Sequence, residues 1–145
     1  MTESTTVNVT NGVGTPEKSL VYRQKTGELF YGGKRVATGY SGRPGEFRNN
    51  PEREGIPNKG PIPKGVWSIE KIHGPLNDTW GSSPIQLKYS GSNLPTGRNG
   101  NSFWIHEGST NASAGCIVLQ RGKGDLARVA KLIEEKKITS LQVVP

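Results

Sequence analysis

The chain has 145 residues, enough for one domain with a single hydrophobic core. Apolar side chains make up 31% and glycines add 20 residues, which predicts a folded chain, while 10 prolines favour short strands and turns over long helices. A single cysteine excludes an internal disulfide. The formal net charge of +7 favours anionic partners such as nucleic acid, membrane or bacterial envelope polymers, without choosing among them.

The first 18 residues differ in composition from the rest of the chain. They are rich in Thr, Ser, Asn and Gly, which predicts a flexible N-terminus over 1–18 and a single domain over 19–145. They lack the apolar core of a signal peptide, and no window approaches the length of a membrane span. We therefore expect a protein made in the cytoplasm without a signal peptide and without membrane insertion. It either stays there or is exported by other machinery.

The domain is predicted to begin with a meander of three short strands, at 19–24, 28–31 and 34–38. Gly32-Gly33 joins the last two and is a hairpin signal. Proline and glycine then interrupt residues 41–65 throughout, so few backbone groups there can join a ladder. A loop of that length is usually functional or disordered. A rigid Ω-like loop and a solvated loop with scattered charges both remain open.

Two further strands are predicted at 66–72 and 85–89. His73 follows the first of them in a His-Gly-Pro turn, and we interpret it as a surface residue rather than a catalytic base. Trp80 lies in the next loop and is interpreted as capping the core.

One convincing helix is predicted, beginning near Asp125, which can cap it. Its apolar residues recur at helical spacing, at Leu126, Val129, Ala130 and Ile133. A final strand is predicted at 139–144. We interpret the basic helix as a solvated cover over a sheet. No helix-turn-helix, zinc or RNA-binding pattern accompanies it, so no nucleic-acid partner is expected.

The most informative stretch is residues 101–119, where two strand-like flanks enclose nine small or polar residues. If the flanks pair as a hairpin, His106 and Cys116 are its closing residues. Directly opposite residues have Cβ atoms roughly 4.5–5.5 Å apart, which suits proton exchange between a thiol and an imidazole. A slip of one residue would place the two side chains on opposite faces.

The chemistry of this stretch is that of a cysteine nucleophile. A neighbouring His106 can convert the Cys116 thiol into a thiolate. Gly115 allows close approach of a substrate, and backbone N–H groups around it can hold an oxyanion. Ser113 can bond the loop or the substrate. The alternative is that Cys116 is a small buried hydrophobe at the start of a strand.

The motifs resemble a known family. Ile-His-Glu-Gly at 105–108 and Ala-Ser-Ala-Gly-Cys-Ile-Val-Leu at 112–119 are similar to the active-site signature of L,D-transpeptidases. Tyr-Ser-Gly at 40–42, Gly-Pro-Ile-Pro-Lys-Gly at 60–65 and Arg98 resemble one branch, the effector domain delivered by the type VI secretion system. The resemblance covers roughly residues 20–120.

The sequence departs from the pattern of that family at three positions. Many transpeptidases have a second histidine and an arginine where this chain has Ala114 and Val118, and Glu107 displaces the glycine that usually follows the histidine. These changes affect the choice of acceptor and the rate rather than the possibility of the chemistry.

The resemblance implies a mainly β fold, an L,D-transpeptidase-like β-sandwich with one C-terminal α-helix. It implies that Cys116 attacks tetrapeptide stems of peptidoglycan with His106 as base, forming an acyl-thioester resolved by water, a D-amino acid or another stem. Arg98 would clamp a substrate carboxylate. No metal or organic cofactor is implied, and two histidines with one cysteine are poor material for zinc.

The implied biology is that of an antibacterial toxin acting in the periplasm of a target bacterium. Its partners would be peptidoglycan stem peptides, a cognate immunity protein and a type VI delivery component. A papain-like peptidase is discounted because no histidine follows Cys116. The alternative from another class is a non-catalytic basic module that binds the envelope or belongs to a phage tail.

Overall fold

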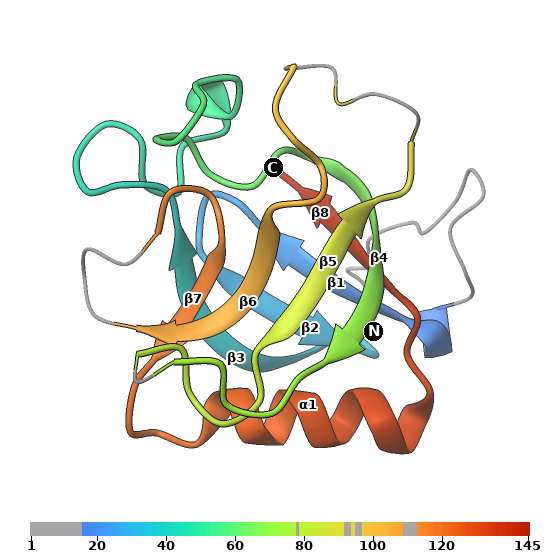
Figure 1. Cartoon of the computed structure of the whole chain (residues 1–145). Helices are drawn as coiled ribbons and strands as arrows, with labels where there is room; N and C mark the ends of the chain where they lie inside the picture. Colours follow the sequence, from blue (N-terminus) through green and yellow to red (C-terminus); the bar gives the residue numbers. More distant parts are fainter. Residues whose placement is uncertain (1–15, 78, 92–93, 95–96, 109–112) are drawn as a thin grey trace.

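The computed structural model describes residues 16–77, 79–91, 94, 97–108 and 113–145. In these ranges eight strands form one closed barrel in the order β1-β2-β3-β7-β6-β5-β4-β8, and one helix crosses an end of it (Figure 1). The prediction of a mainly β fold with a single C-terminal helix is confirmed. The strands close into a barrel where the resemblance implied a sandwich. The predicted flexible N-terminus lies outside the described residues up to residue 15.

The strands agree closely with those predicted from alternation and turn signals. They are β1 (Ser19–Arg23), β2 (Glu28–Tyr31), β3 (Lys34–Ser41), β4 (Gly65–Ile72), β5 (Ile85–Tyr89), β6 (Phe103–Gly108), β7 (Ile117–Gln120) and β8 (Ser140–Val144). Gly32 and Gly33 both have positive φ, at 60° and 80°, as the predicted two-residue hairpin turn requires. Two short 3₁₀ turns complete the described elements, η1 (Pro16–Lys18) and η2 (Pro51–Arg53).

The helix α1 (Asp125–Lys136) contacts β3, β6 and β7 through its predicted apolar face. The predicted cap is wrong: Gly124 occupies the N-cap position in the left-handed conformation, and no side chain caps the helix. Asp125 instead lies in the first turn, where it pairs with Arg128. A carboxylate there still stabilises the positive end of the helix dipole.

The core fills the barrel and the space between the barrel and the helix. Trp67 is at its centre, fully buried, with its ring against Tyr89 and Phe103 at centroid distances of 5.3 and 4.8 Å. Its indole N–H donates to the carbonyl of Pro63, so the one polar atom of this buried ring is satisfied. The packing fixes β4, β5 and β6 relative to the loop before β4.

The predicted hairpin of residues 101–119 is wrong, because β6 and β7 run parallel, with Ile105 beside Ile117 and His106 beside Val118. An alternating pattern is the same for parallel and antiparallel strands, so the sequence carried no signal for direction. The other neighbour of β7 in the barrel is β3, which is antiparallel to it.

Candidate active site

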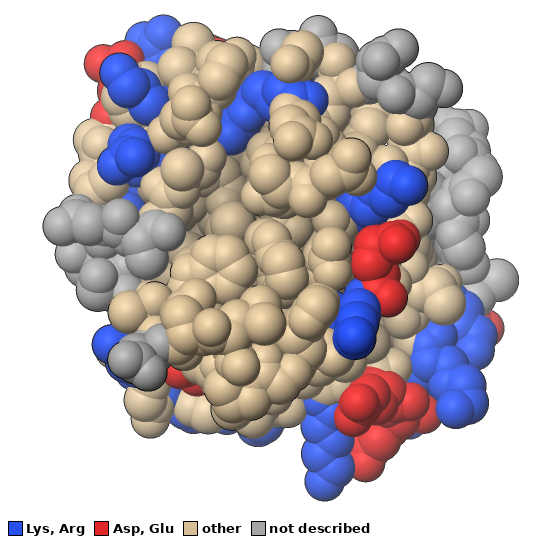
Figure 2. Space-filling model, viewed as in Figure 1, with Lys and Arg blue, Asp and Glu red and all other residues tan. Residues whose placement is uncertain are grey.

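Cys116 and His106 lie on the same face of the barrel wall, although the strands are parallel. Ile105 and Ile117 are paired and both belong to the core, so the residues that alternate with them point outward. Continuing the register places Cys116 beside Trp104, two positions along the strand from His106. The alternation of side chains along each strand places Cys116 and His106 on one face. Figure 2 shows that the visible face over β5, β6 and β7 is mainly uncharged, with Lys and Arg and some Asp and Glu around its margin.

His106 is held by its own strand and by the loop between β4 and β5. Its Nδ1 lies 2.7 Å from the carbonyl oxygen of Glu107, which accepts only if Nδ1 carries the proton. In the neutral ring Nε2 is then the proton acceptor. Trp80 stacks on the imidazole with centroids 4.3 Å apart and planes 6° from parallel, and its carbonyl accepts from the Glu107 N–H at 3.0 Å. The ring is therefore fixed in plane and tautomer.

Burial disfavours the charged form of both candidate catalytic groups. Burial lowers the pKa of His106, and the hydrogen bond to the Glu107 carbonyl opposes that effect. Burial also raises the pKa of Cys116 to about 11, opposed by a hydrogen bond from the Trp104 backbone and by the charge of Arg98. Among the described residues no hydrogen bond joins the Cys116 sulfur to the His106 ring. Both shifts favour a thiol beside a neutral imidazole over a thiolate–imidazolium pair.

The turn before Cys116 is built by Ser113. Its hydroxyl donates to the Cys116 carbonyl at 2.7 Å and accepts from the N–H groups of Gly42 and Gly115, at 2.8 and 3.1 Å. A hydroxyl has one proton and two lone pairs, so its bonding capacity is used fully. An oxyanion held by the Gly115 N–H would have to displace the Ser113 oxygen. The roles of both residues toward a substrate stay predictions.

The opposite side of the turn is held by Ser41, at the end of β3. Its hydroxyl donates to the Gly115 carbonyl at 2.9 Å and accepts from the Ile62 N–H at 2.7 Å. Ser41 belongs to the Tyr-Ser-Gly motif and Ile62 to the Gly-Pro-Ile-Pro-Lys-Gly motif. Motifs far apart in the sequence therefore meet at the turn that carries Cys116.

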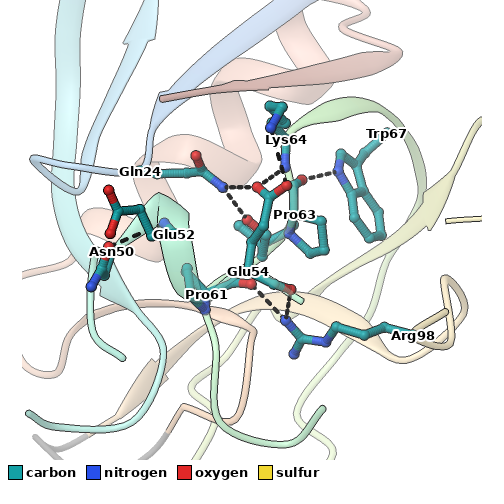
Figure 3. Close-up of polar contacts among 10 residues, drawn as sticks. Gln24, Asn50, Glu52, Glu54, Pro61, Pro63, Lys64, Trp67 and Arg98 are labelled. Carbon is teal, nitrogen blue, oxygen red and sulfur yellow. Dashed lines mark hydrogen bonds and ion pairs between the residues drawn. The ribbon is translucent and has the colours of Figure 1, made fainter. Parts of the chain in front are cut away.

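Arg98 is 9% exposed and lies beneath the same turn. Its guanidinium donates to the carbonyls of Glu54 and Pro61 at 2.9 and 2.7 Å (Figure 3). It also donates to the Ala114 carbonyl at 3.0 Å. The prediction that it binds a substrate carboxylate stays a prediction.

Sequence reasoning missed an aromatic row beside the candidate site. Trp104 lies between Trp80 and His73, at ring centroid distances of 5.2 and 5.0 Å. His73, which was predicted to be a surface residue, is half-buried. Its Nε2 forms a hydrogen bond with the side-chain oxygen of Gln86 at 2.8 Å. Trp80 was expected over the core but instead packs on His106. No local pattern identifies such contacts, which join residues in different loops and strands.

Within the described ranges, no three His, Cys, Asp or Glu side chains gather as metal ligands would. The described part of the chain also contains no helix long and apolar enough to cross a membrane.

Fold and site together define a class: a mainly β barrel with one helix, carrying a cysteine and a histidine on one outer face of two neighbouring strands. Residues 35–144 match the family model described as the Tlde1 domain. The protein therefore belongs to the Tlde1 domain family, the type VI secretion effectors with L,D-transpeptidase-like activity, as the motifs predicted.

Solved structures show a related fold at low identity. The chain is similar to the crystal structure of the helical cell shape determining protein Pgp2 from Campylobacter jejuni, with a TM-score of 0.54 and 16% identity. A lysine-to-alanine mutant of that protein matches with a TM-score of 0.48 and 14% identity. Each match covers 86% of this chain and 46% of the other, so this chain spans about half the length of Pgp2. No curated protein matches the chain.

Proposed function

We propose that the protein is a cysteine enzyme that modifies tetrapeptide stems of peptidoglycan through an acyl-thioester. The observation that carries the proposal is the placement of Cys116 and His106 on one outer face, with the histidine Nδ1 bound to a carbonyl. Because Nδ1 carries the proton in that bond, Nε2 is the nitrogen that can accept a proton as the base. The membership in the Tlde1 domain family supports the substrate class.

The proposed reaction begins with transfer of the Cys116 proton to His106 Nε2 as the sulfur attacks the carbonyl carbon between the third and fourth stem residues. The imidazolium then protonates the leaving amine of D-alanine, the C–N bond breaks, and a thioester remains on the sulfur. Water, a free D-amino acid or the amine of another stem attacks that thioester. The outcomes are carboxypeptidase, exchange and transpeptidase activity, respectively.

The neutral resting pair fits this sequence of steps. A thiol whose pKa is raised to about 11 is almost wholly protonated at neutral pH, so the thiolate forms only as the proton moves to the base. The low pKa of His106 keeps its Nε2 unprotonated and available. Ser113 and Gly115 hold the turn, and a substrate that displaces their mutual bond would gain an N–H donor for the oxyanion.

Intact mass spectrometry with purified tetrapeptide muropeptides tests the proposal. The wild type should gain the mass of the acyl group and release D-alanine, whereas Cys116→Ala should do neither. His106→Gln should lose at least about a hundredfold in rate, because general-base catalysis typically contributes 10²–10⁴-fold. His73→Gln is the matched control, since it removes the other histidine and should keep the rate. Equal trimming by wild type and Cys116→Ala would reject the proposal.

We further propose that the protein acts as an antibacterial toxin in the periplasm of a target bacterium, delivered by type VI secretion and neutralised by an immunity protein. The family membership supports this proposal. Directing the chain to the periplasm of a test bacterium should arrest growth, and Cys116→Ala should not. Growth arrest by both forms would show that the toxicity does not depend on the chemistry of Cys116.

A non-catalytic envelope-binding module is the second candidate, and one observation favours it. Burial raises the pKa of Cys116, and no hydrogen bond joins its sulfur to His106 among the described residues. A binding module predicts that wild type and Cys116→Ala sediment equally with purified peptidoglycan and that neither changes its stems. The muropeptide experiment decides between the two.

A further inference from the structure

Arg98 joins two distant segments of the chain beneath the turn that carries Cys116. One nitrogen, Nη1, donates to the carbonyls of Glu54 and Pro61, at 2.9 and 2.7 Å. The other, Nη2, donates to the Ala114 carbonyl at 3.0 Å. Hydrogen bonds from a charged donor are stronger than neutral ones. The guanidinium therefore fixes the position of the residue two before the candidate nucleophile.

The charged group also packs directly against that turn. The guanidinium carbon lies 4.9 Å from the centre of the Phe103 ring. Gly115 lies so close to both groups that a Cβ on this glycine would be 2.5 Å from Arg98 Nη2 and 2.7 Å from the Phe103 ring. The cation, the aromatic ring and the glycine that precedes Cys116 are thus in close mutual contact.

The segment to which Arg98 is bonded is itself anchored to the barrel. One carboxylate oxygen of Glu54 accepts from the Gln24 side chain at 2.8 Å and from the Lys64 N–H at 3.0 Å, and the other pairs with the Lys64 ammonium at 3.3 Å (Figure 3). Gln24 also donates to the Ile62 carbonyl at 2.9 Å. The loop between β3 and β4 is therefore a rigid support, which favours the Ω-like reading of this segment.

We propose that Arg98 is a positioning residue of the Cys116 site, which ties the turn to the loop between β3 and β4 and sets a buried positive charge beside the sulfur as it becomes a thiolate. The proposal rests on the assignment of Cys116 as nucleophile. Electrostatic attraction between Arg98 and Cys116, which favours the charged form of each, is consistent with this placement. It gives Arg98 a role in place of contact with a substrate carboxylate.

Alkylation of Cys116 by iodoacetamide between pH 7.5 and 9.5 measures the thiolate without any substrate. Arg98→Gln should slow alkylation at pH 8 by about tenfold, equivalent to a rise of one unit in the thiol pKa. Arg98→Lys keeps the charge but cannot bridge three carbonyls, so its alkylation should stay close to wild type. Its kcat on muropeptides should fall at least about tenfold, with KM changed less. Arg35→Gln, on an exposed arginine of β3, is the matched control and should change neither quantity.

Two results would overturn the proposal. One is that Cys116 in Arg98→Gln is alkylated as fast as in the wild type. The other is that Arg98→Lys raises KM and leaves kcat intact, which would indicate that the arginine contacts substrate. Should neither variant fold, the wild type decides, because a cation beside the sulfur must favour iodoacetate over iodoacetamide more than free cysteine does. An equal preference would overturn it. Failure of the proposed function appears separately, as absent turnover in a wild type whose alkylation still depends on Arg98.

Discussion

The indole of Trp80 lies flat against the imidazole of His106, with centroids 4.3 Å apart and planes 6° from parallel. The two residues are 26 positions apart, and the Trp80 carbonyl also accepts from the N–H of Glu107 at 3.0 Å. The loop between β4 and β5 therefore contributes one wall of the candidate site. It restricts rotation of the proposed base and shields it from water.

Replacing Trp80 with alanine should release the His106 ring. We expect kcat to fall about tenfold, because aromatic pairs are worth roughly 0.5–1.5 kcal/mol and tenfold in rate corresponds to about 1.4 kcal/mol. The pKa of His106 should rise toward its ordinary value as burial decreases, measured by NMR titration of the ring proton. Trp80→Phe keeps a ring and should recover most of the rate. An alanine variant with unchanged rate and pKa would exclude this role.

Stability should depend on the protonation of His106. The unfolded imidazole binds a proton near its ordinary pKa of about 6.5, whereas the folded one, with a lowered pKa, does so only at lower pH. As the pH falls below about 6.5, the unfolded state binds more protons and the free energy of unfolding decreases. Above about pH 6.5 the ring is neutral in both states, and the free energy of unfolding no longer changes with pH through His106. Urea unfolding midpoints from pH 7.5 to 5 should show this slope, and His106→Gln should flatten it.

The free energy of unfolding at alkaline pH should depend in the same way on the protonation of Cys116. The unfolded thiol loses its proton near pH 9, while the folded thiol keeps it up to about 11. The unfolded state then binds fewer protons, so stability should fall as the pH rises from about 9 to 11. Cys116→Ala should remove the part of this slope that begins near pH 9. A second part should remain above about 10, because burial also raises the pKa of Tyr22.

Replacing Ser113 with alanine should weaken the turn that carries Cys116. It removes three hydrogen bonds, to Gly42, Gly115 and Cys116, and leaves buried backbone groups without this partner. We expect the free energy of unfolding to fall by about 2 kcal/mol, as measured by urea denaturation. Ser82→Ala, on an exposed serine, should change it by less than about 0.5 kcal/mol. Equal effects of the two substitutions would contradict the contacts described.

Gly115 should tolerate no side chain. Its φ is 135°, and a Cβ would lie 2.5 Å from Arg98 Nη2 and 2.7 Å from the Phe103 ring. Gly115→Ala should cost about 3 kcal/mol from backbone strain and overpacking together. Gly33→Ala isolates the strain, because Gly33 has φ 80° and nothing within 4 Å of its Cβ position, and it should cost about 1 kcal/mol. Calorimetric unfolding of both variants compares the two costs.

Much of the fold was predictable because local patterns determine it. Strand alternation, the Gly32-Gly33 turn and the apolar stripe of the helix each arise within a few residues. The sequence predicted Cys116 and His106 opposite each other only if the flanks formed a hairpin, whereas the strands are parallel and His106 pairs with Val118. Alternation fixes which residues share a face of each strand, whereas strand direction depends on the path of the chain between the strands.

The contacts around the site were not predictable in this way. Arg98 was expected to bind a substrate carboxylate. Its guanidinium donates to backbone carbonyls from two loops, and these contacts depend on how the loops fold. Trp80 has no sequence feature that separates a cap of the core from a partner of His106. Such pairings bring together residues that no local period connects.

The sequence by itself determined the elements, the spacing of His106 and Cys116 and the family, because each depends on residues that are close together in the chain. Only the tertiary structure decided that β6 and β7 are parallel, that burial raises the pKa of the Cys116 thiol, and that a buried arginine supports its turn. The physical reason is that burial, charge and hydrogen bonding at a site are supplied by segments distant in the chain, whose approach is set by packing of the whole barrel.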